Sequence, residues 1–181
     1  MAEIAEQAGV NQALLHYYFR SKARLAEAVF QRAARDLLPA VIETLMSDAN
    51  LPEKVRRVVD IELSTLLRNP FLPGYILSEL NHHPERVEQF IEMTAGLRID
   101  EVAPRLFVRL GRQIEAAVDA GEMRPVAPEQ FVIDLVSLCI FPFAARPMIA
   151  AMTGMDDDAF RAMIERRKAE LPEFFLRGLR P

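Results

Sequence analysis

The chain has 181 residues, of which 51% are apolar and 27% are charged, with a formal net charge of −4. This length and apolar content suffice for one large core, or for a small domain joined to a larger one. One cysteine excludes an internal disulfide framework. No apolar run approaches the ~20 residues that span a membrane, and the charged N-terminus is unlike a secretory signal, so we expect a cytoplasmic protein without a membrane partner.

The first elements of the chain are two short helices around a glycine. Residues 3 to 8 carry apolar side chains at helical spacing, and Gly9 then supplies the positive φ that a sharp turn requires. Asn11 is a good N-cap for a second helix, and Leu15 and Phe19, four residues apart, give that helix a buried stripe. This layout is that of a helix-turn-helix DNA reader.

The free face of the second helix carries side chains suited to DNA. In a helix-turn-helix the N-terminal residues of the second helix contact base edges, while polar groups further along hold phosphates. Gln12 can pair with adenine through two hydrogen bonds, and Ala13 or Leu14 can contact a thymine methyl group. The side chains suited to backbone phosphates are His16, Tyr17, Tyr18 and Lys22.

Charge is distributed unevenly along the chain. Residues 1–35 carry five cationic and three anionic side chains, so this segment is net positive and the remainder is net negative. A weakly basic reader on an acidic body fits a regulator that binds DNA with modest, specific affinity. Arg32 and Arg35 also suit a plain solvated helix face.

These residues resemble the signature of the TetR family, the tetracycline-repressor-like transcriptional regulators. The family pattern runs approximately I-A-x-x-A-G-V-S, then L-Y-x-H-F-x-S-K, then L-x-x-A-V/L, and residues 3 to 30 read IAEQAGVN, LHYYFRSK and LAEAVF. His16 stands where tyrosine is commonest and Tyr18 where histidine is, and both still offer hydrogen-bond donors. The resemblance implies double-stranded operator DNA as the partner, with residues 12–14 facing bases and the phosphate-suited side chains facing the backbone.

Such DNA-binding domains are three-helix units, and the chain begins at what would be the second helix. We expect a first helix before Met1 by analogy. Two explanations stand, a numbering that begins late or a protein that lacks this helix. The first is favoured, because apolar residues such as Val10 and Leu25 would otherwise form an exposed patch. A true truncation should make DNA binding weak.

Helical periodicity continues beyond residue 30 without strand alternation, so we expect an all-α fold. Ser21 should cap a helix from Lys22 to about Met46, with Pro39 bending or breaking it. Further helices are expected from Pro52 to a stop at Asn69 and Pro70, around 74–81, from Pro84, through 85–120 with a kink at Gly96 or Pro104, and over about 128–152 and 156–178. We assign residues 1–30 to a partial DNA-binding domain and 31–181 to an effector-binding and dimerisation domain.

The last two expected helices carry apolar faces that a second chain can cover. Near-heptad spacing relates Phe131, Leu135 and Leu138 on the first, and Phe160, Ile164, Leu171 and Phe174 on the second. The bland alternative is that both faces pack within their own domain. The resemblance favours the interface, because TetR-like proteins dimerise through their final two helices, which implies a homodimer on a palindromic operator.

Aromatic and flexible apolar residues are the candidates for an effector cavity. They are Phe71, Tyr75, Met93, Phe107, Phe141, Phe143 and Met148. In the family such helices surround an inducer cavity, although each residue taken alone is more often plain core. Because the sequence shows no cluster of buried charges, we expect a hydrophobic or amphipathic small molecule of unknown identity.

Motifs of catalysis are absent from the sequence. There is no G-x-S-x-G, Walker loop, H-E-x-x-H or C-x-x-C, and Cys139 lies in an apolar run that suits a buried thiol. His82 and His83 are adjacent and face different sides of a helix end, so we expect no metal site. Because the catalytic motifs are absent, we also expect no cofactor and no enzyme. The sequence predicts a ligand-responsive, dimeric repressor. The alternatives are an activator, or a helical small-molecule-binding or protein-interaction module without DNA binding.

Overall fold

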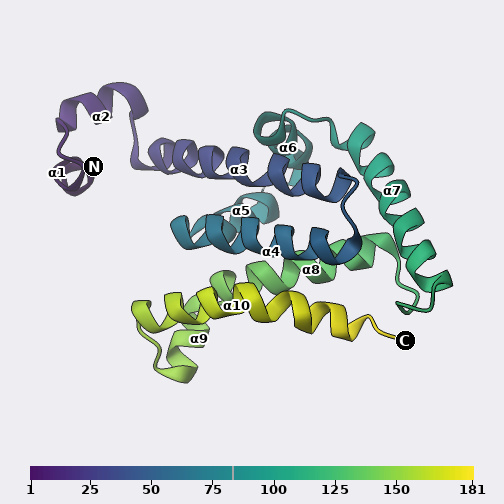
Figure 1. The fold of residues 1–181 in the computed structure, drawn as a ribbon. Coiled ribbons are helices and arrows are strands. Elements are labelled where there is room, and N and C mark those ends of the chain that lie inside the picture. Colours follow the sequence, from purple (N-terminus) through teal and green to yellow (C-terminus); the bar gives the residue numbers. More distant parts are fainter. Residues whose placement is uncertain (83) are drawn as a thin grey trace.

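The computed structural model describes residues 1–82 and 84–181, and within these ranges it contains helices and no strand. The all-α prediction is confirmed. The helices are α1 (Ala2–Ala8), α2 (Gln12–Phe19), α3 (Lys22–Met46), α4 (Leu51–Arg68), α5 (Leu72–His82), the 3-10 turn η1 (Pro84–Arg86), α6 (Val87–Ala95), α7 (Ile99–Asp119), α8 (Pro128–Ala144), α9 (Arg146–Thr153) and α10 (Asp157–Gly178). Figure 1 shows α1 and α2 at one end of the molecule, where the chain enters the body through α3. We call α1 and α2 the N-terminal unit, and α3 to α10 the body.

Local hydrogen bonds explain the sharp start of the chain. Gly9 has a φ of 64°, and the amides of Gly9 and Val10 donate to carbonyl groups of α1, which closes that helix. Asn11 Oδ1 accepts from the amide of Ala13 at 2.8 Å, and Ser21 Oγ accepts from the amide of Arg24 at 3.2 Å. The predicted caps of α2 and α3 are therefore confirmed.

Prolines inside the long helices interrupt them less than expected. α3 continues through Pro39 to Met46, and α7 continues through Pro104. The break after α6 instead falls at Gly96, whose φ of 64° suits a residue without a Cβ atom. α4 ends at Arg68 with Asn69 as its C-cap, directly before Pro70, which agrees with the stop predicted at Asn69 and Pro70.

Helix α4 lies at the centre of the body and packs against α3, α8 and α10. Its fully buried side chains, spaced three and four residues apart, form one stripe along the helix. The apolar ones are Val55, Val58, Val59, Leu63 and Leu66. Residues from the neighbouring helices, including Phe131 of α8 and Ile164 of α10, complete the same core.

The single helix expected over 128–152 is two helices. α8 ends at Ala144, Ala145 has φ −98° and ψ 13°, and α9 begins at Arg146 with a bend of 64° between the pair. Pro147 gives the physical reason. It has no N–H to donate to the carbonyl of Phe143, and its ring would collide with that carbonyl in a continuous helix.

Helix length sets a limit on membrane crossing. Over residues 1–82 and 84–181, no single helix is both long and apolar enough to cross a membrane. α8 and α9 meet that measure only as a bent pair.

A buried lysine holds the far end of α3. Lys54 is fully buried, and its Nζ donates to the carbonyl of Leu45 and to Gln113 Oε1, both at 2.6 Å. Gln113 also donates to a backbone carbonyl of the α3–α4 loop, and Arg109 pairs with Asp48 of that loop. Burial lowers the pKa of Lys54, and the nearby Arg109 charge adds to this. α4 and α7 therefore clamp the loop from two sides.

A buried carboxylic acid lies between α4 and α8. Glu62 is 3% exposed, and its Oε2 has no hydrogen-bond partner among the described atoms. Burial raises the pKa of Glu62 to about 8, and a hydrogen bond from Cys139 opposes that shift. Cys139 is buried, as its apolar sequence context predicts, and burial raises the pKa of its thiol.

Candidate DNA-reading surface and effector pocket

Helix α2 presents its first turn and one face to solvent. All the residues predicted to contact DNA are exposed, namely Gln12, Ala13, Leu14, His16, Tyr17, Tyr18 and Lys22. Gln12 is the first residue of α2, so it lies with the next two residues at the helix end that a helix-turn-helix turns toward base edges. Large side chains left this open, such as Tyr17 at 79% exposure, are available to a partner.

The corner between α2 and α3 collects groups suited to phosphate. Lys22 is the first residue of α3, whose N-terminal amides and helix dipole favour an anion. Tyr17 and Tyr18 meet edge to face, with ring centroids 5.3 Å apart. Arg20, which sequence reasoning did not assign to DNA, is exposed at the same corner with a φ of 59°. Such strained backbone is a recurrent mark of functional turns.

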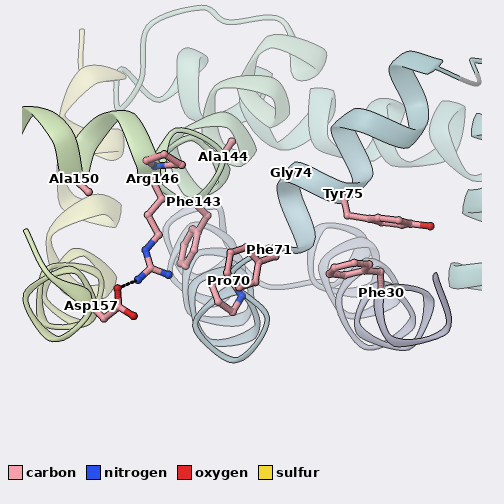
Figure 2. A pocket seen from close by; sticks show the side chains of 11 residues that line it. Phe30, Pro70, Phe71, Gly74, Tyr75, Phe143, Ala144, Arg146, Ala150 and Asp157 are labelled. Carbon is pink, nitrogen blue, oxygen red and sulfur yellow. Dashed lines mark hydrogen bonds and ion pairs between the residues drawn. The ribbon is translucent and has the colours of Figure 1, made fainter. Parts of the chain in front are cut away.

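A pocket of about 600 Å³ opens between α3, α5, α8, α9 and α10 (Figure 2). Its lining residues are Phe30, Pro70, Phe71, Gly74, Tyr75, Phe143, Ala144, Arg146, Pro147, Ala150 and Asp157. The volume falls within the range of small-molecule sites, and the walls are apolar except for one arginine and one aspartate.

The structure brings together three of the seven residues predicted for the effector cavity. Phe71, Tyr75 and Phe143 line the pocket. Met93 lines a second cavity of about 280 Å³, on which Tyr75 also borders. The other three lie elsewhere: Phe107 packs against the core, while Phe141 and Met148 are 58% and 52% exposed and line neither of these cavities.

Sequence reasoning missed eight of the eleven lining residues, and three of these bring an aromatic or charged side chain from distant parts of the chain, namely Phe30, Arg146 and Asp157. Phe30 of α3 stacks on Tyr75 with centroids 4.3 Å apart and planes 19° apart. Arg146 donates to Asp157 of α10, and its guanidinium lies 4.8 Å from the ring centroid of Phe160. One local signal was present, since a proline such as Pro147 is typical of the first turn of a helix and here follows an apolar run.

Most residues predicted for the dimer interface lie inside the chain's own core. The buried ones are Phe131, Leu135, Phe160, Ile164 and Leu171, each at most 5% exposed. Leu138 is half-buried against the same core, and Phe174 is 66% exposed. Apolar spacing identifies a buried face without stating what covers it. For these five residues, the expectation that a second chain covers them is corrected: α4 and neighbouring helices do so.

Metal-binding groups do not gather in the part of the chain that the structure describes. No set of three or more His, Cys, Asp or Glu residues there could hold a metal ion. The Nδ1 of His82 donates to the carbonyl of Ser78 at 2.7 Å. His83 lies outside the described residues.

Two family models match separate parts of the chain. The family model described as "Bacterial regulatory proteins, tetR family" matches residues 1–29, and "Tetracyclin repressor-like, C-terminal domain" matches residues 52–171.

Two curated relatives also match parts of the chain. An uncharacterised HTH-type transcriptional regulator of Mycobacterium tuberculosis is 30% identical over 129 residues, 70% of this chain and 52% of the relative. The nucleoid occlusion factor SlmA of Vibrio campbellii is 30% identical over 96 residues, 50% of this chain and 49% of the relative. The chain thus spans about half the length of the curated relatives it matches. By the two family models, which together cover most of its length, the chain belongs to the TetR family of bacterial regulatory proteins.

Proposed function

We propose that the chain is a homodimeric transcriptional repressor that a small hydrophobic or amphipathic effector releases from a palindromic operator. One observation carries the proposal: α3 serves both sites. Its first residue, Lys22, follows the helix expected to read bases, and its Phe30 forms a wall of the pocket. A regulator of this kind acts on chromosomal DNA, so the proposal includes a cytoplasmic location.

The contact between Phe30 and Tyr75 is the proposed route from pocket to DNA. A molecule in the pocket touches this ring stack directly, and the stack joins α3 to α5. An effector changes the arrangement of α3 only as far as it binds the two arrangements with different affinity. By linkage, operator DNA must then weaken effector binding by the same factor by which the effector weakens operator binding.

The DNA-contact proposal assigns base selection to Gln12, Ala13 and Leu14, and phosphate contact to His16, Tyr17, Tyr18 and Lys22. Selection from random DNA identifies the operator, and binding to it is then measured over a salt series. Lys22→Ala should weaken binding to all sequences and reduce the salt slope by about 1, whereas Lys168→Ala on α10 should leave that slope unchanged.

Substitution of Gln12 separates base reading from backbone contact. Gln12→Ala should relax preference at one base pair per half-site, by about 1–3 kcal/mol of discrimination. Gln130→Ala, an exposed glutamine on α8, is the matched control. A chain that selects no sequence from random DNA would contradict the repressor, and would favour the alternative of a small-molecule-binding or interaction module.

The proposed dimer interface moves to the exposed faces of α8 and α10. Ile133, Phe141 and Phe174 are 56%, 58% and 66% exposed on these helices. Exposed apolar side chains of this size mark interaction surfaces. In sedimentation experiments Ile133→Asp and Phe174→Asp should yield monomers, while Val108→Asp, at a similarly exposed position on α7, should not. A wild-type chain that sediments as a monomer at every concentration would contradict this interface.

A second candidate comes from the Vibrio relative, whose name describes nucleoid occlusion. It would use the same DNA-reading surface with a different outcome. A transcription reporter and cell-division imaging in strains with Gln12→Ala separate the two. If the chain is a repressor, Gln12→Ala should raise expression of the gene next to the operator. If it is an activator, the same substitution should lower that expression.

A further inference from the structure

We propose that the effector pocket takes an organic anion, a molecule with an aromatic or aliphatic body and one acid group that pairs with Arg146. This inference rests on the proposed function, because it names the chemical class of ligand for the same pocket. It goes beyond the expectation of a hydrophobic or amphipathic effector, because it names the charge that the effector carries.

The pocket has a polar end and an aromatic end. Figure 2 shows Arg146 and Asp157 at one end and the stacked rings of Phe30 and Tyr75 at the other, with Phe143 between them. No other charged residue lines this pocket in the part of the chain described. A ligand that fills it must therefore present a polar group at one end of an apolar body.

Exposure decides which charge the ligand carries. The side chain of Arg146 is 22% exposed, whereas that of Asp157 is 93% exposed. A carboxylate in water contributes little to an ion pair, because solvent screens it. A largely covered guanidinium binds an acid through short, charge-assisted hydrogen bonds that are among the strongest in proteins. The pocket therefore favours an anion over a cation.

The arginine is positioned before any ligand arrives. Its guanidinium lies over the ring of Phe160, a buried residue of α10, at 4.8 Å from the centroid. Arg146 is also the first residue of α9, so the break between α8 and α9 fixes the position of its backbone beside the pocket. Asp157 is then an exchangeable partner, which an incoming acid group replaces while the cation–π contact persists.

A matched pair of fluorescent dyes tests this assignment on the full chain. Anilinonaphthalene sulfonate carries an acid group on a two-part aromatic body, and N-phenylnaphthylamine has that body without the acid. The chain contains no tryptophan, so the emission of both dyes is free of that background. The wild type should bind the acid dye about tenfold more tightly than the neutral dye, as hydrogen bonds to a charged group imply.

Four variants isolate the arginine. Arg146→Gln should weaken the acid dye about tenfold and leave the neutral dye unchanged, and Arg146→Lys should fall between, because it keeps the charge without the guanidinium fork. Asp157→Asn should strengthen the acid dye, since it removes a competing partner. Arg112→Gln, an exposed arginine on α7 outside the pocket, should change neither dye. Thermal unfolding midpoints verify that each variant is folded, and Arg146→Lys serves if the glutamine variant is not.

The outcomes separate this inference from the proposed function. Equal weakening of both dyes by Arg146→Gln, or weaker acid-dye binding by Asp157→Asn, overturns the anion assignment. Displacement of the neutral dye by dodecyltrimethylammonium in an Asp157-dependent manner also overturns it and assigns a cation. Acid-dye binding that depends on Arg146 but leaves operator affinity unchanged supports the anion site and contradicts the ligand-responsive repressor. Absence of binding by either dye overturns the anion site, while the repressor proposal is then decided by operator selection alone.

Discussion

The N-terminal unit and the body differ in how many residues they bury and in how clearly their candidate sites can be identified from the sequence. α1 and α2 contain one buried residue, Ala5, whereas α4 alone contains nine. Yet the N-terminal unit holds the recognisable sequence signature, and the body holds the pocket that no motif announces. A surface that meets DNA is encoded in consecutive side chains that stay exposed. A pocket is encoded in contacts between helices that are distant in the chain.

The largest effect is expected in the core of the body. Phe131→Ala removes a fully buried ring that meets Phe175 edge to face, and should lower the free energy of unfolding by about 3–5 kcal/mol. Phe71→Ala, at a side chain that is 73% exposed, should change it by less than about 0.5 kcal/mol. Denaturant titration checks both values, and equal losses would erase the contrast between packed and open positions.

The next effect depends on pH and comes from Glu62. The folded chain keeps the proton of Glu62 up to about pH 8, while the unfolded chain releases it near its usual pKa of 4.5. Stability should therefore fall as pH rises from about 5 to 8, by about 1.4 kcal/mol per pH unit at most, and level off above that range.

Glu62→Gln should remove this decline, so its advantage over the wild type grows toward pH 8. Glu129→Gln, at an exposed position of α8, is the control and should run parallel to the wild type. Parallel curves for Glu62→Gln and the wild type would mean that the acid is not protonated in the folded chain.

A smaller effect compares two helix caps. Asn11 caps α2 and Asn50 caps α4 through the same contact, a side-chain oxygen that accepts a backbone N–H. Replacement of either by alanine should cost about 1 kcal/mol. Asn50→Ala should lower global unfolding stability, whereas Asn11→Ala should appear as faster amide hydrogen exchange within α2. Loss of global stability in both variants would show that the N-terminal unit and the body unfold as one.

The smallest effect on stability is expected at Tyr17. Tyr17→Phe removes only a hydroxyl group from a side chain that is 79% exposed, so the unfolding free energy should stay within about 0.5 kcal/mol. Operator affinity should fall by about 0.5–1.5 kcal/mol if the hydroxyl donates to a phosphate. A loss of stability with unchanged DNA binding would assign Tyr17 to structure.

The parts of the fold that follow from local rules were predictable. Asn11 and Ser21 cap the helices they precede, and α3 spans Lys22 to Met46 as its pattern indicates. Helical periodicity and capping depend on residues only a few positions apart, so both can be predicted from the sequence alone. The break at Ala145, just before Pro147, was not predicted. Pro39 and Pro104 lie inside continuous helices, so a proline in the sequence does not by itself decide whether a helix breaks there.

The parts that depend on tertiary contact were not predictable. The spacing of Phe131, Leu135 and Ile164 identifies an apolar face, but a neighbouring helix and a second chain produce the same spacing. The pocket likewise needs Phe30 to meet a ring from α5, and Arg146 to meet an acid from α10. The apolar periodicity of a single helix does not show which residues of other helices it will contact.

The clamp on the α3–α4 loop has a mechanical consequence. Lys54 and Gln113 hold the end of α3 near Leu45. The buried residues of α3 all lie between Ala33 and Leu45, so the end of the helix that begins at Lys22 is the less constrained one. At 1.5 Å per residue, Phe30 lies roughly 22 Å and Lys22 roughly 35 Å from the fixed point. If α3 turned as a rigid rod about its end near Leu45, a displacement at Phe30 would be roughly one and a half times larger at Lys22, which follows the helix proposed to read bases.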